Sequence, residues 1–224
     1  FIAFIDDDDI WNSKKLKIQI KELLSSNAGI AICGINYFQL DQDTSKYLSF
    51  NFDDNLFLSL LKKGSGVNTS TLLFKKEILL KINGFDREGL KTYTDFDVLV
   101  KASQICNHVE IKTPLVNYYV DNKSISRNYK AKFEGKKLVL ERYKHLYKEN
   151  NLMSFYSNHL EVLADYALLH NNKKNDIKYY IKSIALNPLS IKKFLKIIIT
   201  ITGGPKLYNY LLKGRNNINK FLFH

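Results

Sequence analysis

Apolar residues gather in four short segments of the first part of the chain, and each segment has the pattern of a strand. Residues 1–5 form an unbroken apolar run, which is typical of a buried central strand that ends before Asp6. Residues 29–40, 67–74 and 109–120 are rich in β-branched and aromatic side chains, which sheets favour. We therefore predict a strand at each of these four places.

Between these strands, apolar residues recur every three or four positions, which is the spacing of amphipathic helices. The segment 41–54 is polar and is predicted to be a loop. Strands and helices that follow one another in this way predict a mixed α/β half-domain of three or four strands. Its helices are expected at residues 13–25, 55–63, 75–82 and 95–104.

Beyond residue 128 the apolar spacing is helical throughout. Pro188 ends one of these helices, because proline cannot supply the backbone N–H that a helix interior needs. Gly203, Gly204 and Pro205 end the last of them. The predicted helices cover residues 131–149, 158–171, 174–187 and 189–202.

The change of pattern divides the chain into two predicted domains. Residues 1–128 form an α/β domain, and residues 129–224 form a helical, basic carboxyl-terminal region. The sequence opens at Phe1 inside an apolar run, with no turn or cap before it. We therefore expect the amino-terminal part of the first domain to be missing.

The formal net charge is +12, and most of it lies at the carboxyl end. From Asn171 onward there are eleven Lys or Arg residues against the single acid Asp176, which leaves +10 in this segment. Such an imbalance predicts an anionic surface as the partner. Nucleic acid is not expected, because the basic residues are mostly Lys on predicted helices rather than Arg interleaved with aromatic residues.

The predicted helix at 189–202 has two dissimilar faces. Two interpretations are open: the apolar face lies on an anionic membrane, or it packs on the neighbouring helices. On a membrane, each Lys near the surface contributes about 1 kcal/mol. The apolar face carries Ile191, Phe194, Leu195, Ile198 and Thr202, and the opposite face carries Lys192, Lys193 and Lys196.

The cysteines and the longest apolar stretch indicate the compartment. Cys33 and Cys106 are far apart and have no metal-binding spacing, so we expect free thiols in a reducing cytoplasm. The longest strongly apolar stretch, 197–202, is far shorter than the roughly 20 residues that span a bilayer. We expect a cytoplasmic protein that can lie peripherally at the inner face of the cell membrane.

Four consecutive aspartates follow the first predicted strand. In α/β proteins, ligand sites lie where strands end. Along an extended backbone alternate side chains share a face, so Asp6 and Asp8 are expected to point toward one ion while Asp7 points away. Carboxylate oxygens suit Mn²⁺ or Mg²⁺. The alternative is a solvated acidic loop or the first turn of a helix.

The segment F-I-D-D-D-D-I-W at 4–11 resembles the F-L-D-x-D-D-x-W motif of the family 2 glycosyltransferases, which have the GT-A fold. The resemblance implies a GT-A-like (Rossmann-like) mixed sheet, truncated at its amino terminus. It also implies a nucleotide-sugar site. Asp6 would contact the nucleotide ribose or the metal, Asp8 would be the principal metal ligand, and Asp9 would support the site.

Further segments resemble the same family in the same order. They are V-N-T-S-T-L-L-F-K-K-E at 67–77, G-F-D at 84–86 and Y-T-D-F-D at 93–97. The resemblance implies that Asp95 is the general base, although Thr94 stands where the family usually has Glu. The alternative for Asp95 is an ordinary acid in the first turn of a helix. Residues expected near the acceptor are Gly84, Phe85, Asp86 and Asp97.

The loop after the last predicted strand, 118–126, resembles the family's Y-R-x-H-x-x-S-x-S segment. Asp121 stands at the position of the His, so the resemblance implies a further metal ligand there. Lys123 and Arg127 are expected to contact the diphosphate of the donor. Their alternative is an ordinary solvated surface charge.

These resemblances imply an inverting glycosyltransferase that uses Mn²⁺ or Mg²⁺. The expected donor is a nucleotide sugar, and the expected acceptor is a hydroxyl of a glycan or lipid-linked glycan, as in capsule or lipopolysaccharide synthesis. We expect the present chain to be inactive alone, because the family's first strands would be absent.

Two other classes compete with this one. An apolar strand followed by D-x-D also opens the haloacid dehalogenase-like phosphatases, but those carry Thr or Val where this chain has Ile10. They also lack segments like G-F-D and T-D-x-D. The second alternative is a non-catalytic, degenerate transferase that binds an anionic membrane or polymer.

Overall fold

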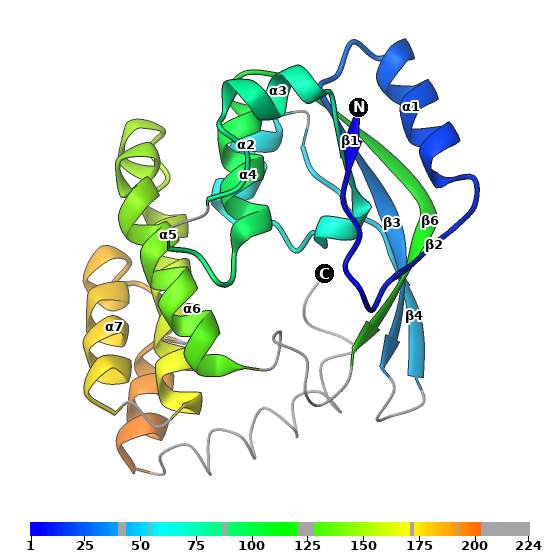
Figure 1. The fold of residues 1–224 in the computed structure, drawn as a ribbon. Coiled ribbons are helices and arrows are strands. Elements are labelled where there is room, and N and C mark those ends of the chain that lie inside the picture. The colour runs from blue at the N-terminus through cyan, green and yellow to red at the C-terminus, as the bar shows by residue number, and fades with distance from the viewer. Residues whose placement is uncertain are drawn as a thin grey trace. The chain divides into compact units, whose positions relative to one another are not determined.

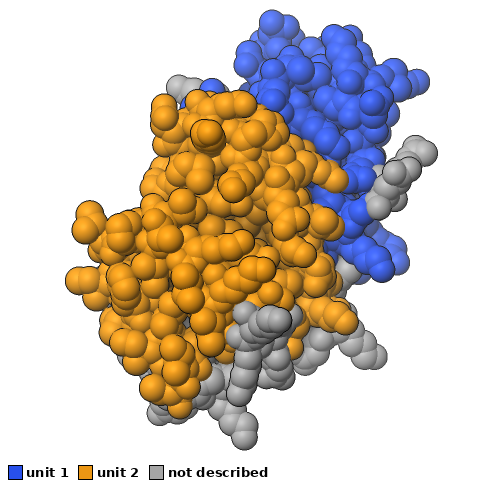
Figure 2. Space-filling model, turned by 90° about the vertical axis from the view of Figure 1, so that its left-hand side faces the viewer, with its two compact units in different colours: residues 1–127 blue, residues 128–224 orange. Residues whose placement is uncertain are grey.

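The computed structural model divides the chain into two compact units, Phe1–Arg127 and Asn128–His224, which are called unit 1 and unit 2 below (Figure 2). The elements of each unit are given separately. The residues that the structure describes are 1–39, 44–53, 55–86, 89–120, 128–170, 173–191 and 193–202, with only the backbone at 173 and 174.

Unit 1 is built on a six-stranded mixed sheet with the order β1-β5-β3-β6-β2, and β4 also pairs with β3. The long strands β3 and β6 run parallel, and every other pairing is antiparallel. The predicted mixed α/β class is thereby confirmed for this unit. The strands are β1 (Ile2–Ala3), β2 (Ile10–Trp11), β3 (Ile30–Gln39), β4 (Thr44–Leu48), β5 (Leu72–Phe74) and β6 (His108–Val120).

Helices lie on both sides of this sheet: α1 on one side, and α2, α3 and α4 on the other (Figure 1). On the α1 side, Leu23 packs in a buried cluster with Ala31, Cys33 and Val116 from the central strands. This two-sided covering explains why β3 reads as a continuous apolar run rather than as an alternation. The helices of unit 1 are α1 (Lys15–Ser25), α2 (Leu56–Lys63), α3 (Lys76–Lys81) and α4 (Thr94–Ser103), with a 3₁₀ turn η1 (Thr69–Thr71) before β5.

The pairing of β3 with β6 shifts register around Gly34, which lies opposite Pro114. A Cβ atom on Gly34 would stand only 2.6 Å from the carbonyl oxygen of Lys112, so glycine is required at this close approach. Proline has no N–H to give to a ladder, and such an irregularity is where a sheet accepts it.

Three strand predictions for unit 1 need correction. The first apolar run is not a buried central strand: β1 has two residues at the edge of the sheet, and Phe1 and Ile5 are 52% and 53% exposed. The predicted strand at 67–74 pairs only at β5, because Asn68 accepts a hydrogen bond from the backbone N–H of Ser70 and turns the chain first. The predicted loop 41–54 contains β4.

Unit 2 is helical in the residues described, and its central helix α6 packs on both α5 and α7. Asn128 caps α5 by accepting a hydrogen bond from the backbone N–H of Ala131 (3.0 Å). Asn151 has a left-handed backbone (φ 57°), which ends α5 and lets α6 begin at once, five residues before the predicted start at 158. The helices are α5 (Tyr129–Glu149), α6 (Met153–Leu169) and α7 (Lys173–Leu186).

Residues 191 and 193–202 are helical as well. Lys193 is only 1% exposed and Thr200 is buried, whereas Ile191 and Ile198 are exposed. The apolar face of this segment therefore does not pack on the bundle. Of the two open interpretations, packing on the neighbouring helices is wrong. Among the helices that the structure describes, none is both long enough and apolar enough to cross a membrane.

Candidate active site in unit 1

The four aspartates occupy the crossing between β1 and β2, which lie at opposite ends of the strand order (Figure 1). The backbone N–H of Asp9 donates to the carbonyl oxygen of Asp6 (3.2 Å), which closes a turn. The segment is therefore not extended, and a turn rather than strand alternation sets the directions of Asp6 and Asp8. We call residues 6–9 the acidic turn.

Ser70 holds the acidic turn from both sides. Its hydroxyl oxygen accepts a hydrogen bond from the backbone N–H of Asp6 (2.9 Å), and its carbonyl oxygen accepts one from the indole Nε1–H of Trp11 (3.1 Å). Ser70 is fully buried, and Asn68 fixes its own N–H (2.7 Å). The sequence prediction missed Ser70. The available signal was the N-x-S spacing, which forms this side-chain turn.

Asp9 is the buried member of the acidic turn, at 7% exposed. Neither carboxylate oxygen has a hydrogen-bond partner among the described residues. The Ser70 hydroxyl and the Tyr119 backbone lie beside it without completing a well-shaped bond. Burial, helped by the charges of Asp6 and Asp8, raises the pKa of Asp9 to about 6. A buried carboxylate without a partner indicates a ligand of positive charge.

The rest of the acidic turn faces solvent. Asp6, Asp7 and Asp8 are exposed. The pKa of Asp6 is raised, first by partial burial and then by the charges of Asp8 and Asp7. The turn thus combines one buried carboxylate with three accessible ones, and their mutual repulsion makes the group receptive to a cation.

Asp95 comes from a different part of unit 1. It lies in the first turn of α4, just after Tyr93, whose backbone is left-handed (φ 65°). Its Oδ2 accepts a hydrogen bond from the hydroxyl of Ser65 (2.5 Å). The pKa of Asp95 is raised mainly by burial and also by the charge of Asp6. The structure therefore brings Asp95 within electrostatic reach of the acidic turn.

The predicted acceptor segment at 84–86 also meets the start of the chain. Gly84 follows α3 in a left-handed conformation (φ 64°), and its N–H donates to the carbonyl oxygen of Leu79 (2.8 Å). The Phe85 ring then packs edge-on against Phe4, with centroids 4.8 Å apart. Asp86 is partly buried. The G-F-D turn therefore supports the strand that leads into the acidic turn.

The other predicted site residues lie elsewhere. Asp97 is fully buried, and its carboxylate forms an ion pair with Nζ of Lys101 (2.6 Å) on the same helix, so it supports α4 from within. The predicted metal ligand Asp121 and the predicted phosphate contacts Lys123 and Arg127 lie outside the described residues.

Lys15 is a buried cation that the sequence prediction missed. Its Nζ lies 4.0 Å from the ring centroid of Trp11 and donates to Oε1 of Gln19 (2.7 Å). Gln19 in turn donates to the carbonyl oxygen of Thr71 (2.8 Å). Burial lowers the pKa of Lys15 to about 8. Together, Lys15 and Ser70 fix the Trp11 ring behind the acidic turn.

The donor set at the acidic turn fits a hard divalent cation in part. Its oxygens are carboxylates, which Mn²⁺ and Mg²⁺ prefer, and Asp9 offers a buried one that has no hydrogen-bond partner among the described residues. No group of three His, Cys, Asp or Glu side chains is arranged to hold a metal among the described residues. A cation here would therefore draw most of its ligands from water or from a bound substrate, as Mg²⁺ commonly does.

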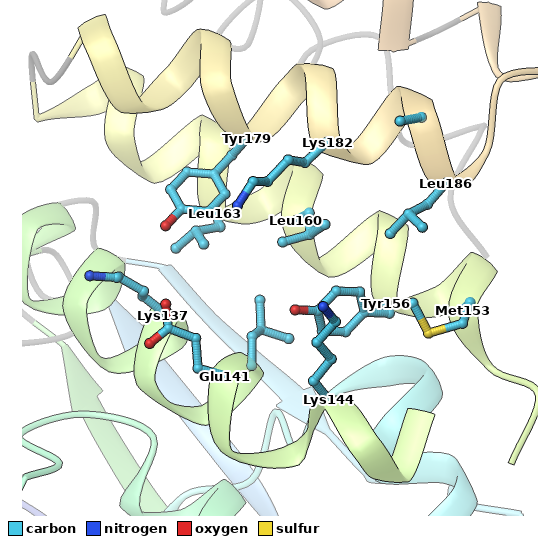
Figure 3. A pocket seen from close by; sticks show the side chains of 12 residues that line it. Lys137, Glu141, Lys144, Met153, Tyr156, Leu160, Leu163, Tyr179, Lys182 and Leu186 are labelled. Carbon is cyan, nitrogen blue, oxygen red and sulfur yellow. The ribbon is translucent and has the colours of Figure 1, made fainter. Parts of the chain in front are cut away.

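Unit 2 has a groove of its own, about 410 Å³ in volume, between α5, α6 and α7 (Figure 3). Leu160 and Leu163 of α6 form its apolar floor, and Lys144 and Lys182 reach into it from the two walls. Its chemistry suits a ligand that carries both apolar carbon and negative charge. Nothing in this groove resembles the acidic turn of unit 1.

A comparison with protein-family models finds no match for this chain, and a comparison with the curated proteins finds none either. The assignment to a family therefore remains a prediction from the motifs.

Proposed function

We propose that unit 1 is the catalytic part of a metal-dependent inverting glycosyltransferase with a GT-A-like fold. One observation carries the proposal: four sequence segments that resemble the family's motifs meet at one place. The acidic turn contacts the second segment through Ser70. Phe4, which precedes the turn, packs on Phe85 of the G-F-D turn, and the charge of Asp6 helps to raise the pKa of Asp95 in the fourth segment. Separate surface acids would have no reason to converge in this way.

The acidic turn is the proposed site of the divalent cation and of the donor diphosphate. Asp8 and Asp6 are accessible from solvent, and Asp9 offers a buried carboxylate that no described residue pairs by a hydrogen bond. When bound, the cation would neutralise the negative charge that develops on the diphosphate as it departs. The backbone of the turn is fastened to Ser70 through the N–H of Asp6, and Trp11 just after the turn is fastened to the same residue, so the turn is shaped before the ligand arrives.

Asp95 is the proposed general base. Its raised pKa makes its carboxylate a stronger proton acceptor than an ordinary aspartate, and the hydrogen bond from Ser65 orients it. In the proposed step, Asp95 takes the proton of an acceptor hydroxyl while the hydroxyl oxygen bonds to the anomeric carbon. The bond from that carbon to the diphosphate breaks, and its electron pair leaves with the diphosphate. One displacement of this kind inverts the anomeric centre.

The proposed substrates are a nucleotide sugar as donor and a glycan or lipid-linked glycan as acceptor. Calorimetric titration of the full-length protein with a panel of nucleotide sugars, with and without Mn²⁺, tests the donor half. Binding of one donor that requires Mn²⁺ and is lost in Asp8→Ala supports the proposal. Asp8 is exposed, so this substitution should leave folding intact. Asp53→Asn, at an exposed acid paired with Lys63, is the matched control.

The competing function is a degenerate transferase without catalysis. It predicts no metal-dependent binding of any donor, with the fold intact by circular dichroism. A phosphatase of the haloacid dehalogenase type predicts release of inorganic phosphate from a phosphate ester, which the transferase does not. The same purified protein therefore separates the three classes.

A further inference from the structure

The end of the described chain presents a row of exposed apolar side chains. Their positions recur at helical spacing, so they share one face of the helical residues 191 and 193–202. Each is between 46% and 75% exposed. We call this row the apolar stripe. It consists of Ile191, Phe194, Leu195, Ile198 and Ile201.

The opposite face of the same segment is fastened to α6 by its charged residues. Nζ of Lys196 forms ion pairs with Glu161 (2.6 Å) and Asp165 (2.7 Å). Nζ of Lys193, which is 1% exposed, donates to the hydroxyl of Ser157. The segment is thus oriented with its cationic side inward and its apolar side outward, the reverse of an ordinary surface helix.

The serines of α6 and α7 make this orientation specific. Ser157 donates to the carbonyl oxygen of Ser183 (2.7 Å), and Ser183 donates to the carbonyl oxygen of Ser157 (2.7 Å). This reciprocal pair places the Ser157 oxygen where it accepts a hydrogen bond from Lys193. Buried lysines are retained only with such partners. The contacts of Lys193 and Lys196 with α6 therefore hold the stripe outward.

The charge of the segment indicates what covers the stripe. Residues 171–224 carry eleven Lys or Arg residues and one acid. A second copy of the chain would bring the same excess of positive charge to the interface and would be repelled. An anionic lipid surface would be attracted by that charge and would also accept the apolar side chains. Contiguous apolar surface of this kind marks a docking site.

We propose that the apolar stripe docks unit 2 on an anionic lipid bilayer. The segment lies in the plane of the headgroups, with the stripe toward the acyl chains and Lys193 and Lys196 still bound to α6. The rest of the basic segment supplies the attraction to the headgroups. This docking does not depend on the transferase activity proposed for unit 1.

Sedimentation with vesicles tests the docking. One vesicle is phosphatidylcholine alone, and in the other about a third of the lipid is phosphatidylglycerol. We expect the full-length protein to sediment with the anionic vesicle, less so with the neutral one, and to be released by salt. The double substitution Phe194→Ser and Ile198→Ser should weaken binding to the anionic vesicle by at least about tenfold, because two apolar side chains no longer leave water.

Matched controls separate this effect from loss of apolar surface in general. Leu24 on α1 and Leu80 on α3 are 69% and 66% exposed, so Leu24→Ser and Leu80→Ser remove comparable side chains from unit 1. Both should bind the vesicles as the unmodified protein does. The stripe variant should keep the fold of the parent by circular dichroism, because Phe194 and Ile198 are 46% and 56% exposed.

Three outcomes would overturn the proposal. Equal binding of the anionic vesicle by the stripe variant and the parent would remove the stripe as the docking surface. Loss of binding in Lys144→Ser, with the stripe variant unaffected, would assign the lipid to the groove of unit 2. Light scattering that shows a dimer in the parent and a monomer in the stripe variant, without vesicle binding in either, would assign the stripe to a second copy.

Discussion

The acidic turn of unit 1 and the contact of Lys196 with α6 in unit 2 treat charge in opposite ways. In unit 2, Lys196 lies between two carboxylates, those of Glu161 and Asp165. In the acidic turn of unit 1, Asp9 has no hydrogen-bond partner among the described residues, and the pKa of Asp6 is raised. Charges that are matched from within stabilise a fold. Charges left unmatched at one place cost stability, and such places are where ligands bind.

The largest expected effect comes from neutralising one carboxylate in each unit and comparing the turnover of the two variants. Asp95→Asn should lower turnover by roughly 10²- to 10⁴-fold, because the general base is lost, and should leave donor affinity unchanged. Asp165→Asn in unit 2 removes a carboxylate that pairs with Lys196 and Tyr180, so turnover should not change. Quenched assays of sugar transfer and donor titration measure the two quantities.

An Asp95→Asn protein that transfers sugar at the parent's rate would remove Asp95 from the chemistry. A variant that loses donor affinity together with turnover would instead show a role in shaping the donor site. Neither result would bear on the ion pairs that Lys196 forms in unit 2.

The second test removes the cation from the paired charges of unit 2. Lys196→Met leaves Glu161 and Asp165 facing each other without the cation between them. Because removing one partner of a largely buried ion pair strands the other, we expect a loss of about 3 kcal/mol in the free energy of unfolding. Urea denaturation followed by circular dichroism measures it.

The double variant Lys196→Met with Glu161→Gln is the control for that loss. It removes one of the two stranded charges and should recover part of the stability. No difference between the single and double variants would mean that the ion pair does not stabilise the helix on α6.

A third test uses pH to separate the units. The pKa of Asp9 is about 6 in the folded protein, above the ordinary value of 3.8, so the folded state binds more protons between these values. Stability should therefore rise as the pH falls from about 7 to 4. Asp9→Asn should reduce this slope, and substitutions in unit 2 should not. Thermal melts at several pH values measure it.

Added Mn²⁺ gives a second measurement on the Asp9 carboxylate. The ion requires the ionised carboxylate, so it should raise the melting temperature more at pH 7.5 than at pH 5. Asp9→Asn should weaken this dependence on the metal. A melting temperature that Mn²⁺ leaves unchanged at both pH values would contradict a cation at the acidic turn.

The smallest expected effect compares a buried lysine in each unit. Burial lowers the pKa values of Lys15 and Lys136 to about 8, below the ordinary 10.5. The folded state thus favours the neutral amine, and stability should rise as the pH increases from about 8 to 10. Lys15→Met and Lys136→Met should each reduce this rise of stability with pH. At pH 7 the change from Lys15→Met should be within about 1 kcal/mol, because Met fills similar space without the desolvated amine.

Apolar spacing predicted secondary structure correctly where one face of an element was clearly apolar. The prediction of a helix at 55–63 agrees with α2 (Leu56–Lys63), whose buried residues recur at helical intervals. The edge position of β1 could not be predicted, because an apolar run does not say how many neighbours a strand has. Similarly, the two faces of 191–202 were recognisable, but only tertiary contacts with Glu161 and Ser157 decide which face points inward.

The candidate site was less predictable than the fold. Motif resemblance selected Asp6 and Asp95, but the effect of the Asp6 charge on Asp95 depends on how the chain crosses the sheet, and no local spacing encodes that. Ser70 and Lys15 escaped notice because a serine in a turn and a lysine on a charged helix look like surface residues. Their burial is visible only once Trp11 is placed between them.

The acidic turn also has a consequence for sequence change. Surface loops usually tolerate insertions and deletions. This one is bound to β5 through β1 before it, to β6 through β2 after it, and to Ser70 within it. Losing or gaining one residue would shift Ile10 from its place opposite Asn117 and reverse which side Trp11 faces. A library of single-codon insertions and deletions should therefore be depleted at residues 4–11, however freely the same positions accept substitutions.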